Sequence, residues 1–177
     1  SSLSADTRGV IQGFVHACEV LFAFEISQYL YGALLVMAGL VAFRWRTSEL
    51  LPWALLFVGL SHLTARFLAD ILKPPFSRFR PFEALGGNGW HDTWFAVVGN
   101  SFPSGHAVHF WSLFFPLVVL FPRHRVPLVI LPLLVSAARV AVNDHYLSDV
   151  LASSALAALV TWMYDVTILE RGLKRAV

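Results

Sequence analysis

The stretch Ser101-Phe102-Pro103-Ser104-Gly105-His106 stands between a glycine-rich segment and an apolar run, residues 107–121, and it has the pattern of a buried helix beginning. Proline suits a first helical turn because its missing N–H would find no helical partner there. The open amides that follow, together with the positive end of the helix dipole, favour a bound anion such as phosphate. His106 adds a side chain that exchanges a proton near neutral pH. An ordinary helix start with an N-cap serine explains this stretch more simply, so the rest of the chain must decide.

The composition indicates a membrane protein. Of the 177 residues, 57 % are hydrophobic and 14 % are charged, whereas typical globular domains carry about 25 % charged residues. We therefore expect residues 1–177 to form a single integral membrane domain, an all-α helical bundle. The single Cys18 excludes an internal disulfide and a cysteine-based metal site. The net charge of +2 and the absence of a basic run predict no nucleic-acid partner.

Five apolar segments predict helices long enough to cross a bilayer, at about 1.5 Å per residue. These segments are residues 27–43, 50–72, 103–121, 126–142 and 147–169. Residues 4–25 predict a further helix, which is amphipathic because its polar residues recur on one face. The polar residues are Arg8, Gln12, His16 and Glu19. Two placements of this helix are open: in the membrane interface, or across the bilayer as a sixth span with its polar stripe toward other helices.

The segment of residues 73–102 differs from the spans because prolines and glycines interrupt it throughout. We expect these residues to break any helix from Lys73 onward and to form an extracytoplasmic loop over the site, of a length typical of functional loops. Its Trp90 and Trp94 fit a lid or a lipid contact, although anchoring in the headgroup region is the simpler role for a tryptophan.

The charges at the ends of the spans predict the orientation, since short cytoplasmic connections collect lysine and arginine. One side carries Arg44, Arg46, Arg123, Arg125, Arg171, Lys174 and Arg175. The long loop, the start of the 103–121 helix and the turn at residues 143–148 fall on the other side. We therefore expect the C-terminus in the cytoplasm and the His106 face outside it.

This topology brings three polar clusters, distant in sequence, to one membrane surface. The clusters are Lys73 with Arg80, then Ser104 with Gly105 and His106, then Arg139 with His145 and Asp149. His145 and Asp149 are four residues apart, so on a helix the carboxylate can accept from one imidazole nitrogen and leave the other free for attack. Each cluster also has a simpler interpretation, either cations that reach for lipid headgroups or an ion pair at a helix start.

Together the clusters favour metal-free phosphoryl transfer. The acidic residues of this face lack the spacing of a metal motif; they are Asp70, Glu83, Asp92 and Asp144. Cations and helix amides can instead stabilise the charge that spreads over the phosphoryl oxygens in a loose transition state. We therefore expect no metal and no cofactor.

Three motifs resemble, in order and spacing, the signature of the type-2 phosphatidic acid phosphatase superfamily. They are Lys73-(six residues)-Arg80-Pro81, then Pro103-Ser104-Gly105-His106, then Arg139-(five residues)-His145-(three residues)-Asp149. One position departs from the pattern: Ala138 stands where the third motif usually has serine, which puts one accessory hydrogen bond in doubt.

The resemblance implies a bundle of six helices, which favours the 4–25 helix as the sixth element, and it implies a role for each matched residue. His145 would be the nucleophile that forms a phosphohistidine, with Asp149 orienting it and His106 acting as the general acid. The phosphate-binding residues would be Lys73, Arg80, Ser104, Gly105 and Arg139.

The resulting prediction is a compact enzyme of the bacterial inner (plasma) membrane that hydrolyses a lipid phosphate monoester or diphosphate at the extracytoplasmic surface. The candidate substrates are a polyprenyl diphosphate, phosphatidylglycerol phosphate, phosphatidic acid and the 1-phosphate of lipid A. The expected partners are this substrate and the bilayer, with no obligate protein partner. Two alternatives stay open: a lipid phosphotransferase, and a non-catalytic protein that binds anionic lipids through Lys73, Arg78 and Arg80.

Overall fold

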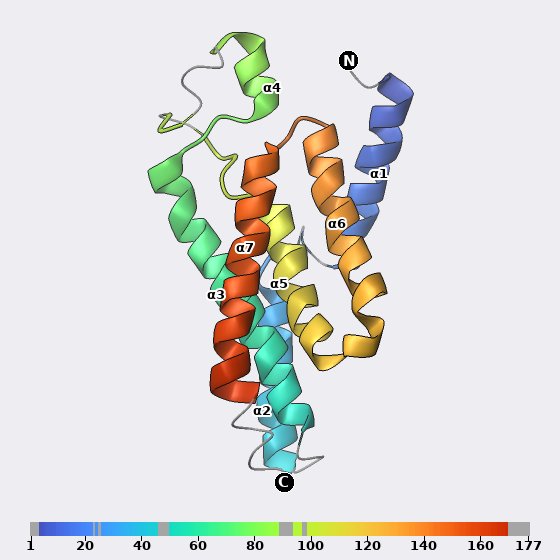
Figure 1. The fold of residues 1–177 in the computed structure, drawn as a ribbon, viewed down its shortest axis with the longest axis vertical. Coiled ribbons are helices and arrows are strands. Elements are labelled where there is room, and N and C mark those ends of the chain that lie inside the picture. Colours follow the sequence, from blue (N-terminus) through green and yellow to red (C-terminus); the bar gives the residue numbers. More distant parts are fainter. Residues whose placement is uncertain are drawn as a thin grey trace.

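The computed structural model describes residues 4–22, 24, 26–45, 50–88, 94–96 and 99–169, which form an all-α bundle (Figure 1). The helices are α1 (Ala5–Leu21), α2 (Leu30–Trp45), α3 (Leu51–Phe76), α4 (Pro81–Glu83), α5 (Gly105–Leu120), α6 (Arg125–Ala141) and α7 (Leu147–Tyr164). A π-helical turn, Ala84–Asn88, follows α4, and another, Asp165–Leu169, follows α7. A 3₁₀ turn, Pro122–His124, joins α5 to α6.

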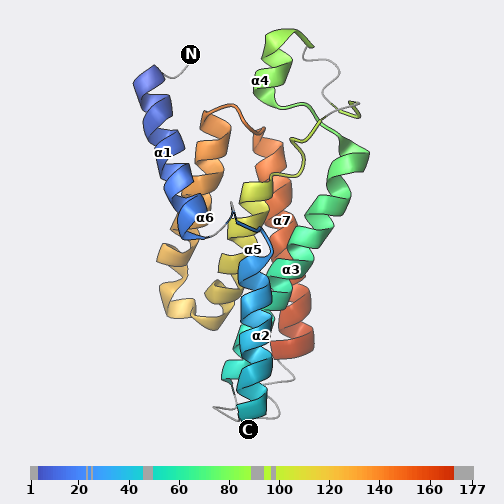
Figure 2. The ribbon, with the colours of Figure 1, turned by 180° about the vertical axis from the view of Figure 1, so that it is seen from behind.

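Helix α5 is the centre of the bundle. Figures 1 and 2 show it between α3, α6 and α7 from both sides, and it packs against all three. Every residue from 107 to 113 is buried, which explains why this helix is apolar nearly all round instead of striped. The neighbouring helices therefore fix the first turn of α5, which carries Gly105 and His106.

The expected spans are all helical, but they differ in length. Within the described residues, three helical stretches are long and apolar enough to cross a membrane: Leu51–Gly86, Pro122–Ala141 and Leu147–Ile168. By this length and composition the chain is an integral membrane protein. Helices α2 and α5 are apolar but have 16 residues each, about 24 Å of helix against a hydrocarbon core of about 30 Å. The prediction of five full-length spans is thus confirmed for three.

Helix α1 runs along α6 in both views (Figures 1 and 2). Its Cys18 packs with Phe110 of α5 and Val135 of α6, whereas Gln12 and His16 of the polar stripe are exposed. The helix ends at Leu21, four residues before the predicted end. Among the described residues the bundle therefore has six helices of 16 residues or more, the number that the resemblance implies.

The expectation that no helix continues past Lys73 is wrong. Helix α3 continues through Pro74 and Pro75 and ends at Phe76. The next residue, Ser77, is its C-cap, and its φ of 30° lies in the left-handed region. Both prolines fall in the last turn, so the N–H···O bonds they remove lie at the end of the helix and those of its body are intact. The Phe76 ring packs against Trp94 and Phe102, with ring centroids 6.0 and 4.9 Å apart, so contacts distant in sequence hold this turn.

The middle of the expected loop is also helical. Pro81 begins α4 because proline suits the first position of a helix. The Glu83 carboxylate accepts a hydrogen bond of 2.6 Å from the Arg80 N–H and so caps this short helix. Trp90, one of the two tryptophans considered for a lid or a lipid contact, lies outside the described residues.

The contact of α2 with α3 depends on glycine. A Cβ on Gly59 of α3 would lie 2.8 Å from the backbone oxygen of Gly32 and 2.9 Å from the Val36 nitrogen, both in α2. Such distances are too short for real contacts, so the two backbones approach closely only because Gly59 has no side chain.

We expect Gly59→Ala to lower the melting temperature of the detergent-purified protein. Overpacking against a backbone costs about 1–3 kcal/mol, and the shift would be about 2 °C or more. The matched control is Gly13→Ala in α1, where a Cβ meets no described atom within 4 Å. Equal melting temperatures for both variants, measured by thermal denaturation, would contradict a tight α2–α3 contact.

Candidate active site

The candidate site lies where the C-terminal ends of α3 and α6 meet the N-terminal ends of α5 and α7. Helix α5 starts deeper in the bundle than α7 does (Figure 1). Its cap residue bonds to the first two turns of α7: the Ser104 N–H donates to the backbone oxygen of Asp149 at 3.5 Å, and the Ser153 hydroxyl donates to the Ser104 oxygen at 3.1 Å. The first turn of α5 is therefore recessed between its neighbours, and Ser104 is fully buried.

Two cations of α3 reach this first turn of α5. A Cβ on Gly105 would lie 3.4 Å from Nη1 of Arg66 and 3.5 Å from Nζ of Lys73. Arg66 is fully buried and donates to the Gly105 oxygen at 2.9 Å, so it fixes the backbone there. Ser104 caps the helix, its hydroxyl accepting from the Ala107 N–H at 3.4 Å. The Lys73 ammonium thus stands against helix amides that favour an anion.

His145 is buried in the turn between α6 and α7. Its Nδ1 lies 2.8 Å from the Ser101 backbone oxygen and 3.7 Å from the nearer oxygen of Asp149. Because a backbone oxygen can only accept, Nδ1 carries the proton and Nε2 keeps its lone pair. The expected hydrogen bond from His145 to Asp149 is therefore replaced by one to Ser101, with Asp149 as a nearby charge.

Burial lowers the pKa of His145 from its ordinary value. The Asp149 carboxylate opposes this shift, while the charges of Arg80 and Arg139 add to it. The neutral imidazole, which is the nucleophilic form, therefore persists to lower pH than in an exposed histidine.

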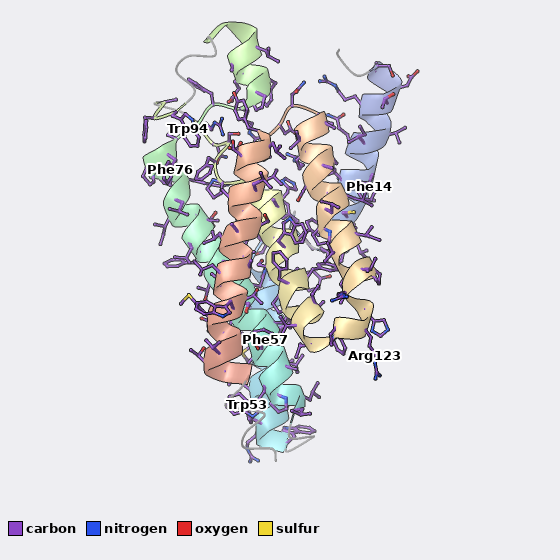
Figure 3. All side chains as sticks on the ribbon, in the orientation of Figure 1. Phe14, Trp53, Phe57, Phe76, Trp94 and Arg123 are labelled. Carbon is purple, nitrogen blue, oxygen red and sulfur yellow. The ribbon has the colours of Figure 1, made fainter. Side chains whose placement is uncertain are left out.

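Asp149 has no solvent exposure and is held by several donors. Nη1 of Arg78 lies 2.5 Å from its Oδ1, and the Ser101 hydroxyl and the Tyr146 N–H donate to its Oδ2 at 2.6 and 2.9 Å. The Arg78 guanidinium lies between two rings, 4.1 Å from the centroid of Trp94 and 3.7 Å from that of Tyr146. Trp94 therefore contacts a site residue, near the end of α3 that carries Phe76 (Figure 3).

One carboxylate, that of Asp144, lies near both arginines of the predicted site. Oδ2 of Asp144 lies 3.0 Å from Nη2 of Arg139, and its Oδ1 lies 4.0 Å from Nη1 of Arg80. An arginine near the end of an apolar helix needs such an anion, because an unpaired charge there is costly. Asp144 thereby holds both guanidinium groups near His145.

His106 faces α1. Its Nε2 is hydrogen-bonded to Oε1 of Glu19, and its ring stacks on Phe24 with centroids 4.2 Å apart. It is close enough to Arg139 and His145 to interact electrostatically with both. The structure thus brings all three predicted clusters together at one end of the bundle.

The charges of the site suit an anion. The cations Lys73, Arg66, Arg78, Arg80 and Arg139 surround the α5 mouth and His145. In the part of the chain that the structure describes, no three His, Cys, Asp or Glu side chains form a group that could hold a metal ion. A phosphate group bonded by amides and cations fits this arrangement.

A family model described as the PAP2 superfamily matches residues 54–171, about two thirds of the chain. This chain belongs to the PAP2 superfamily. The family that the three motifs resemble is therefore confirmed, and the match includes every predicted site residue from Lys73 to Asp149.

Two curated relatives of this PAP2 chain carry the name lipid A 1-phosphatase. The protein from Rhizobium johnstonii is 32 % identical over 108 residues, which are 60 % of this chain and 44 % of the relative. The protein from Rhizobium etli is 36 % identical over 90 residues, which are 50 % of this chain and 39 % of the relative. The matched part thus spans less than half the length of these curated relatives.

A solved structure has the same PAP2 fold. It is that of a transmembrane PAP2-type phosphatidylglycerolphosphate phosphatase from Bacillus subtilis, with a TM-score of 0.51 and 23 % identity. The superposition covers 93 % of this chain and 77 % of that one. At this identity the likeness concerns the fold alone.

Among the described residues, several that the structure brings to the PAP2 site were not predicted to belong to it, including Glu19, Arg66, Arg78, Ser101 and Asp144. A buried arginine in the middle of an apolar span is costly, so Arg66 could have been found from its position in residues 50–72. The signal for Glu19 was its place in the polar stripe of an otherwise apolar helix. Arg78 was named only as a cation for anionic lipids in the non-catalytic alternative, and no local signal pairs it or Ser101 with Asp149.

We expect Arg78→Ala to destabilise the protein far more than Arg80→Ala does. The first variant leaves the fully buried Asp149 without its cation, a loss of about 3–5 kcal/mol. Arg80 is more exposed, at 27 %, and its distance of 4.0 Å from Asp144 indicates a weak pair worth at most about 1 kcal/mol. Thermal unfolding of both variants in the same detergent tests this difference, and equal stabilities would contradict the role given to Arg78.

Proposed function

We propose that this PAP2 protein is a membrane phosphatase that hydrolyses a lipid phosphate monoester or diphosphate through a phosphohistidine on His145. The observation that carries the proposal is the placement of His145: its Nδ1 is held by the Ser101 oxygen, and its other nitrogen stays available beside Arg80 and Arg139. A histidine buried among cations gives a phosphoryl group both a nucleophile and groups that stabilise its charge.

In the first step, Nε2 of His145 attacks phosphorus and the bond from phosphorus to the lipid oxygen breaks. The cations Lys73, Arg80 and Arg139, with Ser104 and the Gly105 amide, hold the phosphoryl oxygens. His106 gives its proton to the leaving lipid oxygen. The imidazole of His145 becomes a phosphoimidazolium, and the Asp149 carboxylate, 3.7 Å away, stabilises its positive charge.

In the second step, a water molecule attacks phosphorus from the side that the lipid has left. His106, now neutral, takes a proton from this water as the bond between phosphorus and Nε2 breaks. Phosphate leaves, and His145 regains the neutral form with its Nδ1–H donating to the Ser101 backbone oxygen. No step of this scheme uses a metal or a cofactor, because cations of the chain supply the charge.

The lipid character of the substrate is supported by an apolar cavity beside the site. A cavity of about 370 Å³ lies between α5, α6 and α7. Its lining includes Val140, Leu147 and Val150, each within two residues of Arg139, His145 or Asp149. When the phosphate group of a lipid binds among these cations, the hydrocarbon tail of the lipid would therefore lie next to an apolar surface.

Among the four candidate lipids, we favour the 1-phosphate of lipid A. The support is the name that the two Rhizobium relatives share. The polyprenyl diphosphate, phosphatidylglycerol phosphate and phosphatidic acid are the competing substrates in the test below.

We also propose that the site faces the extracytoplasmic side of the bacterial inner membrane. At the far end of the bundle Arg44, Arg123 and Arg125 are exposed, and Figure 3 shows Arg123 at the opposite end from Trp94. The arginines of the site are instead paired with Asp144 and Asp149. Exposed cations mark cytoplasmic connections. The same rule also uses four cations that lie outside the described residues: Arg46, Arg171, Lys174 and Arg175.

The test is phosphate release by the purified protein from a panel of the four lipids, in detergent with a chelator present. We expect turnover to be highest with the 1-phosphate of lipid A. His145→Ala should lose about 10⁴-fold or more in kcat, because the covalent route is gone. Exposed Arg123→Ala, at the far end, is the control and should keep full activity.

Release of phosphate by His145→Ala at the rate of the unchanged protein would contradict the mechanism. Transfer of labelled phosphate to an added acceptor lipid in place of water would indicate a phosphotransferase. Binding of anionic lipids without turnover of any would indicate a non-catalytic protein.

A further inference from the structure

The end of α1 holds His106 from two directions. Oε1 of Glu19 is hydrogen-bonded to Nε2 of His106, and the Phe24 ring stacks on the imidazole at 4.2 Å with an interplanar angle of 29°. A ring that is stacked on one face and hydrogen-bonded at one nitrogen has little freedom to rotate. Both groups precede residue 54, where the family match begins, so no motif of the family includes them.

Glu19 is itself firmly placed. Its neighbour Cys18 is buried against α5 and α6, and the Phe24 N–H donates to the Glu19 backbone oxygen at 2.8 Å. The Glu19 side chain is only 15 % exposed, and its other carboxylate oxygen lies 3.8 Å from Nδ1 of His16. Arg139 also acts electrostatically on this carboxylate. The packing of α1 therefore holds the Glu19 carboxylate against His106 and away from bulk water.

We propose that Glu19 is a positioning residue for the general acid, and that it holds His106 with Nδ1 directed to the leaving oxygen of the lipid. The inference rests on the proposed function, since it assigns a partner to the acid of that reaction. A carboxylate on one imidazole nitrogen fixes the ring orientation and offsets part of the cost that burial imposes on the protonated ring. His106 would thus have a carboxylate partner of its own, as His145 has Asp149.

The protons balance in both steps. Before attack, the His106 imidazolium donates Nε2–H to Glu19 and carries a second proton on Nδ1. The Nδ1 proton goes to the lipid oxygen as the bond between phosphorus and oxygen breaks, which leaves the neutral ring with Nε2–H still bonded to Glu19. The Nδ1 lone pair then takes the proton of the attacking water. Glu19 keeps its negative charge throughout.

The need for an acid depends on the leaving group, and this dependence separates a positioning role from a structural one. An alkoxide is strongly basic and requires a proton as it leaves, whereas a nitrophenolate leaves readily without one. We therefore compare dodecyl phosphate with a dodecyl-substituted nitrophenyl phosphate. Both have the same acyl-like tail and the same phosphate.

Glu19→Gln keeps the size of the side chain and removes its charge. We expect the rate of the first turnover, followed as the alcohol or phenolate released, to fall about 10-fold or more for dodecyl phosphate and to stay within about twofold for the nitrophenyl ester, with KM nearly unchanged. In the first turnover His106→Ala should give the same pattern with a larger loss, whereas its steady-state turnover should fall on both esters because the second step lacks its base. The matched control is Asp6→Asn, the same chemical change at an exposed position of α1, and it should leave both esters unaffected.

An equal loss on both esters would show that Glu19 only supports the fold and would overturn the proposal. Unchanged rates on both esters would also overturn it, as would faster turnover with a lower KM, which would mean that the carboxylate competes with phosphate for the cations. The proposed function fails in a different way: the unchanged protein would then release phosphate from neither ester.

Discussion

The buried carboxylate of Asp149 is the charge on which the rest of this site depends. With no exposure to solvent, it would be costly unless donors and a cation replaced the lost water. Arg78, the Ser101 hydroxyl and the Tyr146 N–H meet that need. Each comes from a different stretch of chain, so satisfying one charge fixes the end of α3, the approach to α5 and the start of α7.

The position of His145 follows from this arrangement. Ser101 uses its hydroxyl for Asp149 and its backbone oxygen for Nδ1 of His145, so the same residue holds both members of the pair. The turn that carries His145 also carries Asp144, which gathers Arg80 and Arg139. The first turn of α5 adds its amides and the nearby Lys73. The helix ends thus carry the charged groups of the proposed phosphate site, while the body of the bundle stays apolar enough for a membrane.

The sequence was sufficient for the local features of the fold and site. A proline and serine before an apolar run marked the α5 mouth, and apolar length marked the helices, because these signals lie within a few turns of chain. The partners were not found, since Arg78 and Asp149 are 71 residues apart and Glu19 and His106 are 87 apart. No periodicity connects such positions. Prolines were also expected to break any helix from Lys73 onward, whereas in the last turn of α3 and at the first position of α4 they are part of a helix.

The most direct test of the account is to trap the phosphoryl group on the protein. In His106→Ala, an activated nitrophenyl ester needs no acid for the first step, whereas the second step lacks its base. Rapid quenching followed by peptide mass spectrometry should therefore find the phosphoryl group on His145. A phosphoryl group on any other residue, or free phosphate formed in the first turnover with His145 unmodified, would contradict the central claim.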